Sequence, residues 1–163
     1  MINKLVHCAL MIALVFCGSN AFAQNRAQRA IDEKLLNDYF AKNKIVPQRT
    51  PSGVYYTIST KGSGDNCKFG QRVTMSYIGK FLNGEKFDAN VDDNFNPIRP
   101  FSFVLGTGQV IKGWDDGVKM LKKGSHAMLY LPSDVAYGPS GMGPIPPNAV
   151  LMFEVEVTDV KNN

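Results

Sequence analysis

Residues 106–120 read GTGQVIKGWDDGVKM and contain Trp114, the single tryptophan of the chain. From Ile111 onward, apolar residues recur at helical spacing and predict a short helix with one apolar face: Ile111, Trp114, Val118 and Leu121. Asp115 and Asp116 are expected on the opposite face. The first N–H groups of a helix have no partner within it. The segment therefore predicts a small apolar pocket, backed by the indole, that can hold a carbonyl oxygen.

Five segments in which apolar and polar residues alternate surround this helix in the sequence and are predicted strands. They are residues 54–60, 71–81, 101–105, 125–131 and 149–160. Residues 61–65 and Asn83-Gly84 have the composition of turns. One short helix among these strands indicates an antiparallel α+β domain, in which a curved sheet wraps around the helix.

The first 23 residues have the three parts of a secretory signal peptide. Lys4 supplies a positive charge, residues 5–16 are apolar, and Ala21-Phe22-Ala23 has the form of a signal-peptidase site. The apolar run is short for a membrane span. We expect cleavage after Ala23 and a periplasmic or secreted protein. An uncleaved anchor and a lipoprotein processed at Cys17 are the alternatives, and the bulky Phe16 argues against the second.

Residues 24–52 are predicted to form an N-terminal helix and a linker before the main domain, residues 53–161. One apolar stripe runs along a helix predicted over residues 24–45 and consists of Ile31, Leu35 and Tyr39, with Leu36 and Phe40 beside them. Pro47 and Pro51-Ser52-Gly53 end this helix. The stripe has two interpretations. It packs on the domain or tethers it on the membrane side, or it self-associates, so that the protein is a monomer or a weak dimer.

The composition excludes several classes of function. The chain has 18 Lys and Arg against 14 Asp and Glu, a mild and scattered excess that does not indicate nucleic-acid binding. After residue 23 the only histidine is His126, so neither a catalytic triad nor a histidine-based metal site is expected. Cys67 has no disulfide partner in the processed chain. No phosphate-binding loop occurs, and we expect no cofactor and no metal.

Six short motifs follow one another through the main domain. They are MSYIG (75–79), NGEKFD (83–88), FSFVLG (101–106), VIKGWDDGV (110–118), AYG (136–138) and IPPNA (145–149). In these motifs the chain resembles the FKBP-type peptidyl-prolyl cis-trans isomerases. The resemblance covers about residues 53–160, and six motifs in the same order make it specific.

The resemblance implies a curved five-stranded antiparallel half-barrel around the central helix and an aromatic pocket that binds proline. The residues that it assigns to catalysis are Tyr77, Phe87, Asp88, Ile111, Trp114 and Tyr137. Those that it assigns to substrate binding are Phe101, Phe103, Val110, Ile145 and Phe153. Trp114 would form the floor of the pocket and Asp88 part of its wall. The Ile111 N–H and the Tyr137 hydroxyl would donate to substrate carbonyls.

The implied function is isomerisation of Xaa-Pro bonds in unfolded or partly folded exported proteins, through non-covalent stabilisation of the twisted amide. Macrolides of the rapamycin class are implied ligands. Two other classes stay open: a chaperone or holdase that binds proline-containing chains with little turnover, and a structural domain whose aromatic residues are only core. The chain departs from the smallest family members in a longer loop at 89–100, a differently built loop at 138–147 with Met142 near its tip, and Ser76 in place of a common histidine. These loops border the pocket and bear on substrate preference and macrolide affinity.

Overall fold

A computed structural model describes residues 2–162 of the protein, with side chains from residue 23 onward. Its elements are α1 (Ile2–Asn43), β1 (Gln48–Arg49), β2 (Tyr55–Asn66), β3 (Arg72–Phe81), β4 (Lys86–Ala89), β5 (Phe101–Val104), α2 (Lys112–Gly117), η1 (Val118–Met120), β6 (Lys122–Leu131), η2 (Ser133–Val135), η3 (Gly138–Ser140) and β7 (Leu151–Lys161), where η marks a 3-10 helix. The strands pair antiparallel in the order β1-β2-β6-β7-β3-β4, and β5 also pairs with β3.

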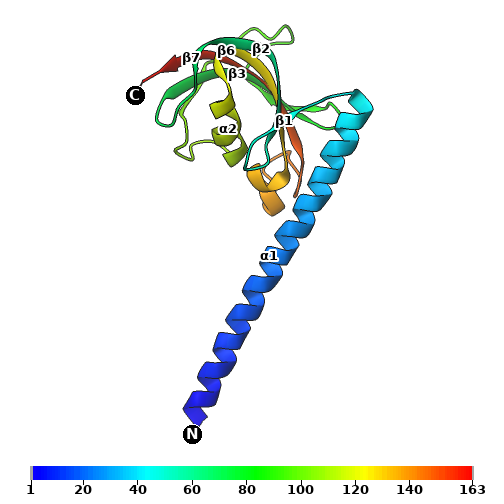
Figure 1. Cartoon of the computed structure of the whole chain (residues 1–163), viewed down its shortest axis with the longest axis vertical. Helices are drawn as coiled ribbons and strands as arrows, with labels where there is room; N and C mark the ends of the chain where they lie inside the picture. The colour runs from blue at the N-terminus through cyan, green and yellow to red at the C-terminus, as the bar shows by residue number, and fades with distance from the viewer. Residues whose placement is uncertain (1, 163) are drawn as a thin grey trace.

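The curved sheet wraps around α2, and the C-terminal part of α1 lies on the outside of the domain (Figure 1). The prediction of an α+β fold with an antiparallel sheet around a short helix is confirmed. The five predicted strands correspond to β2, β3, β5, β6 and β7. Within residues 2–162 the sheet has seven strands rather than five. The two additional strands are β1 with two residues and β4 with four, and the β4 sequence KFDA has a single large apolar residue, so no alternation marks it.

The turn predicted at residues 61–65 is wrong, because β2 continues through it to Asn66 and pairs with β6. Gly62 serves the close approach of these two strands instead. Gly62 has a φ of 69°, and a Cβ at this position would lie 2.4 Å from the backbone oxygen of Lys123. Glycine alone accommodates both the dihedral angle and the contact, and the strand pairing is irregular on either side of it.

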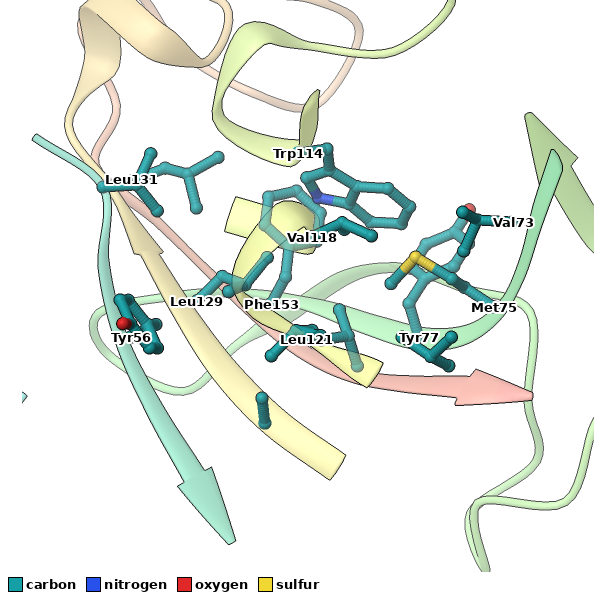
Figure 2. Packing of buried hydrophobic residues seen from close by; sticks show 14 of the residues in the cluster. Tyr56, Val73, Met75, Tyr77, Trp114, Val118, Leu121, Leu129, Leu131 and Phe153 are labelled. Carbon is teal, nitrogen blue, oxygen red and sulfur yellow. The ribbon is translucent and has the colours of Figure 1, made fainter. Parts of the chain in front are cut away.

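The predicted apolar face of the central helix is confirmed. Trp114, Val118 and Leu121 are buried in the main core, on the inner side of the sheet (Figure 2). Asp115, expected on the opposite face, is also buried, at 8% exposure. Its carboxylate accepts hydrogen bonds from the Gly106 N–H at 2.7 Å and the Gly108 N–H at 3.0 Å. Asp115 therefore holds the turn that leads into the helix.

Helix α1 covers most of the helix predicted over residues 24–45 and ends two residues earlier, at Asn43. The signal-peptide prediction falls on residues 1–23, of which residue 1 and the side chains of 2–22 lie outside the described part of the structure. Among the helices that the structure describes, none is both long enough and apolar enough to cross a membrane. The N-terminal half of α1 points away from the sheet (Figure 1).

The C-terminal half of α1 packs on the outer side of the sheet. Leu36 and Phe40 are 0% and 5% exposed and form a second core with Tyr130, Val150 and Met152. Two members of the predicted stripe do not take part, since Ile31 and Leu35 are 54% and 47% exposed. The apolar face that docks is therefore rotated from the predicted one. Packing on the domain is the interpretation that the structure supports.

Cys67 is buried, and this burial raises the pKa of its thiol to about 11. Only the thiolate reacts, so we expect alkylation of Cys67 at pH 8 to be at least ~100-fold slower in the folded protein than in urea. Mass spectrometry of the labelled peptide measures both rates, and equal rates would contradict the prediction. Burial of the protonated Cys67 thiol also makes the free energy of unfolding depend on pH. Its contribution is complete below pH 9 and is lost as the pH rises toward about 11, where the folded protein must bury a thiolate.

Candidate functional site

An aromatic cluster surrounds Trp114 on the inner side of the sheet (Figure 2). The indole is 4% exposed. Four other rings have centroids within 6.0 Å of it, mostly in edge-to-face contact: Tyr77 at 5.1 Å, Phe153 at 5.3 Å, Phe101 at 5.6 Å and Phe103 at 6.0 Å. These rings come from β3, β5 and β7, which are paired through β3. The strand register therefore fixes the cluster around the helix.

Phe87 on β4 extends this cluster toward the edge of the sheet. Its ring centroid lies 5.7 Å from that of Phe153 and 5.0 Å from that of Phe81. A Cβ added to Gly79 of β3 would lie 2.6 Å from the Phe87 ring. The glycine that ends the MSYIG motif thus makes room for the phenylalanine of the NGEKFD motif.

Asp88 holds the hydroxyl of Tyr77. The Tyr77 hydroxyl donates a hydrogen bond to Asp88 Oδ2 at 2.7 Å, and Arg99 Nη2 lies 4.0 Å from Asp88 Oδ1. Burial raises the pKa of Tyr77, and the hydrogen bond to Asp88 and its charge raise it further. The phenol therefore stays protonated at neutral pH and continues to donate to the carboxylate. In this geometry Asp88 positions an aromatic ring of the cluster.

Two donors beside the cluster have no protein acceptor within residues 23–162: the Ile111 backbone N–H and the Tyr137 hydroxyl. Ile111 is the N-cap residue of α2, with φ −57° and ψ 147°, and no side chain caps the helix there. Burial, and then the charge of Asp88, raises the pKa of Tyr137. Its hydroxyl also stays protonated at neutral pH. Both groups can donate to the carbonyl oxygens of a ligand.

The indole N–H of Trp114 is a third donor without an acceptor. Within the described side chains, Trp114 Nε1 is buried and has no hydrogen-bond partner. Leaving such a donor unsatisfied costs about 1–3 kcal/mol. Native proteins rarely keep such groups without a structural or functional reason.

The structure brings the other sequence-predicted site residues to the same core. Val110, Ile111 and Tyr137 are half-buried against it, and Ile145 is buried. Neither of the two cavities described in the structure is lined by a ring of the aromatic cluster. One of about 370 Å³ lies between α1 and residues 133–148, and one of about 170 Å³ lies between residues 97–100 and β3. The half-buried Phe87, Phe101 and Tyr137 leave part of the cluster exposed to solvent.

The sequence model of the FKBP-type peptidyl-prolyl cis-trans isomerases matches residues 64–158, which include every residue of the cluster. The chain belongs to this family. The family resemblance expected from the six motifs is thereby confirmed.

Curated relatives and a solved structure agree with this membership. The chain is 46% identical over 114 residues to FK506-binding protein 4 of Rhizopus delemar, an alignment that covers 69% of this chain and 28% of the relative. It is 39% identical over 150 residues to a probable FKBP-type peptidyl-prolyl cis-trans isomerase of Haemophilus influenzae, covering 91% of this chain and 59% of that protein. The crystal structure of FkpA from Escherichia coli is similar at 31% identity and a TM-score of 0.68, covering 96% of this chain and 72% of that one. The chain thus spans less than a third of the fungal relative and over half of the bacterial one.

Asn90 supports the site, and sequence reasoning missed it. Its side chain is 1% exposed and accepts a hydrogen bond from the Tyr77 N–H at 2.7 Å. It donates to the Met75 carbonyl at 2.8 Å and to the Arg99 carbonyl at 3.0 Å. These hydrogen bonds hold the loop of residues 89–100 against β3, beside Tyr77. An asparagine in a polar loop carries no sequence signal of burial, because both of its carbonyl acceptors are backbone groups.

Replacing Asn90 by alanine is expected to lower the free energy of unfolding by about 2–3 kcal/mol, because a buried N–H and two carbonyls lose their partner. Urea denaturation followed by circular dichroism measures the loss. Asn94→Ala is the matched control, since Asn94 is exposed in the same loop. Equal stability of the two variants would show that the Asn90 contacts contribute little.

Proposed function

We propose that this protein catalyses the cis-trans isomerisation of Xaa-Pro bonds, with the proline bound against Trp114. The observation that carries the proposal is the aromatic cluster, in which a buried indole is surrounded by the rings of Tyr77, Phe101 and Phe153. We assign to the site the residues expected from the family motifs. No nucleophile, metal or cofactor enters this assignment.

The energy that the reaction demands is modest. Rotation about the amide bond has a barrier of roughly 18–20 kcal/mol, and the uncatalysed exchange takes tens to hundreds of seconds. Bringing it to milliseconds requires about four powers of ten in rate, or roughly 5–6 kcal/mol. Binding interactions that strengthen in the twisted state can supply an amount of this size.

The proposed mechanism uses the apolar cluster and two donors. A planar amide is more charge-separated than a twisted one, so a surface that excludes water favours the twisted form. The Ile111 N–H and the Tyr137 hydroxyl would bind substrate carbonyls in that geometry, as preorganised donors do elsewhere. Asp88 holds Tyr77 through the 2.7 Å hydrogen bond and transfers no proton. Only differential binding of the twisted amide lowers the barrier.

A prolyl-peptide isomerisation assay tests the proposal directly. For a four-residue Xaa-Pro peptide, the kcat of the full chain should exceed the first-order rate constant of spontaneous exchange by several powers of ten. A macrolide of the FK506 or rapamycin class should inhibit it, as we infer from the relatives named FK506-binding proteins. Saturable peptide binding at the spontaneous exchange rate would leave a holdase function. Neither binding nor catalysis would leave a structural domain.

We also propose that the protein acts on proline-containing chains that fold after export. The observations that support this are Lys4, the apolar residues 5–16 and the Ala21-Phe22-Ala23 sequence. The processed protein would consist of a helix and linker, residues 24–52, and the isomerase domain, residues 53–161. Mass spectrometry of the protein from its own cells should find Gln24 as the first residue. An intact N-terminus in a cytoplasmic fraction would contradict export.

We propose that the processed protein is a monomer or at most a weak dimer. Ile31 and Leu35 are exposed on α1 and offer only a narrow apolar contact, since Leu36 and Phe40 are already covered by the sheet. Sedimentation equilibrium over a range of concentrations measures the association. A dimer that persists at nanomolar concentration would contradict this proposal.

A further inference from the structure

A cavity of about 370 Å³ lies between α1 and the segment that follows the site residue Tyr137. Ligand pockets in proteins range over about 300–1,000 Å³, so the cavity is large enough for a ligand. Side chains that line it include Gln24, Asn25 and Gln28 from α1, and Asp134, Pro139 and Asn148 from the facing segment. No ring of the aromatic cluster lines it, so it is a site of its own. Figure 1 shows the facing segment in orange beside α1.

The helical wall of this cavity is held in place by a buried carboxylate. Asp32 is 0% exposed and accepts hydrogen bonds from the Ser133 N–H at 2.8 Å and the Ser133 hydroxyl at 2.6 Å. Gln28 donates to the other oxygen of Asp32 at 2.7 Å. An ion pair between Arg29 and Asp134 adds a second link. The two walls therefore form one fixed surface.

The lining matches the chemistry of a polypeptide backbone. Side-chain amides carry both a donor and an acceptor, as peptide groups do. Four residues of the lining have such a group: Gln24, Asn25 and Gln28 on α1, and Asn148 on the facing segment. The one carboxylate in the lining, Asp134, is neutralised by Arg29. A lining rich in amides suits a ligand that both donates and accepts hydrogen bonds better than it suits a metal cation.

The position of the cavity relates it to the proposed active site. Tyr137 is followed directly by Gly138 and Pro139, which line the cavity. The Asn148 N–H donates to the Gly138 carbonyl at 2.8 Å, which ties the two parts of this wall together. The site residue Tyr137 and this wall of the cavity are therefore adjacent in the chain.

We propose that this cavity is a subsite for the polypeptide segment that flanks the isomerised proline, with α1 as one of its walls. The proposal rests on the isomerase function proposed above. It adds that the N-terminal helix takes part in substrate binding and favours extended chains over short peptides. The flanking segment is recognised through its backbone, so its side-chain sequence matters little.

The test compares one short peptide with two longer ones. The short peptide has four residues with a central Xaa-Pro bond. The longer ones add six Ala, Ser or Asn residues to it, on the amino side or on the carboxyl side. For the full chain, one of the longer peptides should have a kcat/KM at least five times that of the short one. The other should show no such gain, because only one direction leads along Tyr137 to the cavity.

Two tryptophan variants of the full chain test whether the higher kcat/KM of the longer peptide depends on the cavity. Asn25→Trp fills the cavity and should reduce the ratio of kcat/KM values, long over short, to about one. Ala30→Trp adds the same side chain at an exposed position of α1 outside the cavity and should keep the wild-type ratio. A wild-type ratio of one, or an unchanged ratio in Asn25→Trp, would overturn the subsite. Loss of the isomerase function itself would appear separately, as spontaneous exchange of the short peptide with the wild-type chain.

Discussion

Replacing Phe87 by alanine should lower kcat/KM for Xaa-Pro isomerisation by about 30- to 100-fold. Removal of a phenyl ring from an apolar contact loses roughly 2–3 kcal/mol of binding, and each 1.4 kcal/mol corresponds to a factor of about ten. The loss falls on the proposed substrate site, because Phe87 is half-buried and its ring meets those of Phe153 and Phe81. A peptide isomerisation assay with the purified variant measures the effect.

The matched control for this experiment is Phe95→Ala. Phe95 is also half-buried, but its ring packs on His126, 5.1 Å away, on the outer side of the sheet. This variant loses a ring of the same size away from the proposed site, so its kcat/KM should stay within about twofold of wild type. Similar losses in both variants would mean that stability, rather than proline binding, explains the Phe87 result.

Replacing Phe40 by alanine should lower the free energy of unfolding by about 3–5 kcal/mol, as truncation of a buried phenylalanine does in other cores. The Phe40 ring contacts those of Tyr130 at 5.0 Å and Tyr55 at 5.3 Å and is 5% exposed. Its removal opens the second core, between α1 and the sheet. Urea denaturation gives the loss, and hydrogen exchange should show faster exchange in α1 than in β3.

Leu35→Ala is the control on the same helix. Leu35 is 47% exposed, so its truncation should change the free energy of unfolding by no more than about 0.5 kcal/mol. If Phe40→Ala were as stable as Leu35→Ala, α1 would not be part of the folded unit. The cavity between α1 and residues 133–148 would then lose its fixed wall.

The parts of the fold that were predictable come from local periodicity. The spacing of Trp114, Val118 and Leu121 identified the apolar face of the central helix, and alternation identified the longer strands. Composition was misleading where glycine serves a close approach rather than a turn, as at Gly62 in β2. The docked face of α1 was predicted only in part: Leu36, Tyr39 and Phe40 belong to the second core, whereas Ile31 and Leu35 are exposed. Helical spacing allows several neighbouring faces, and the partner Tyr130 is distant in sequence.

Buried polar contacts could not be predicted. Asp32 accepts from Ser133 across 101 positions of sequence, and Asn90 bonds mainly to backbone groups. The residues next to Asp32 and Asn90 in the sequence are no different from those around an exposed aspartate or asparagine, so burial leaves no local signal. The aromatic residues of the site were found through the family motifs, whereas periodicity alone placed them only in the core. Their convergence on Trp114 depends on the register of β3, β5 and β7.

The measurement that tests the central claim most directly uses the fluorescence of Trp114. It is the only tryptophan of the chain, so its emission reports on the floor of the proposed site alone. Titration of the full chain with rapamycin should give a saturable change in emission, with a midpoint equal to the concentration that half-inhibits isomerisation. Inhibition of isomerisation with no change in the Trp114 emission would place the proline site elsewhere and contradict the account.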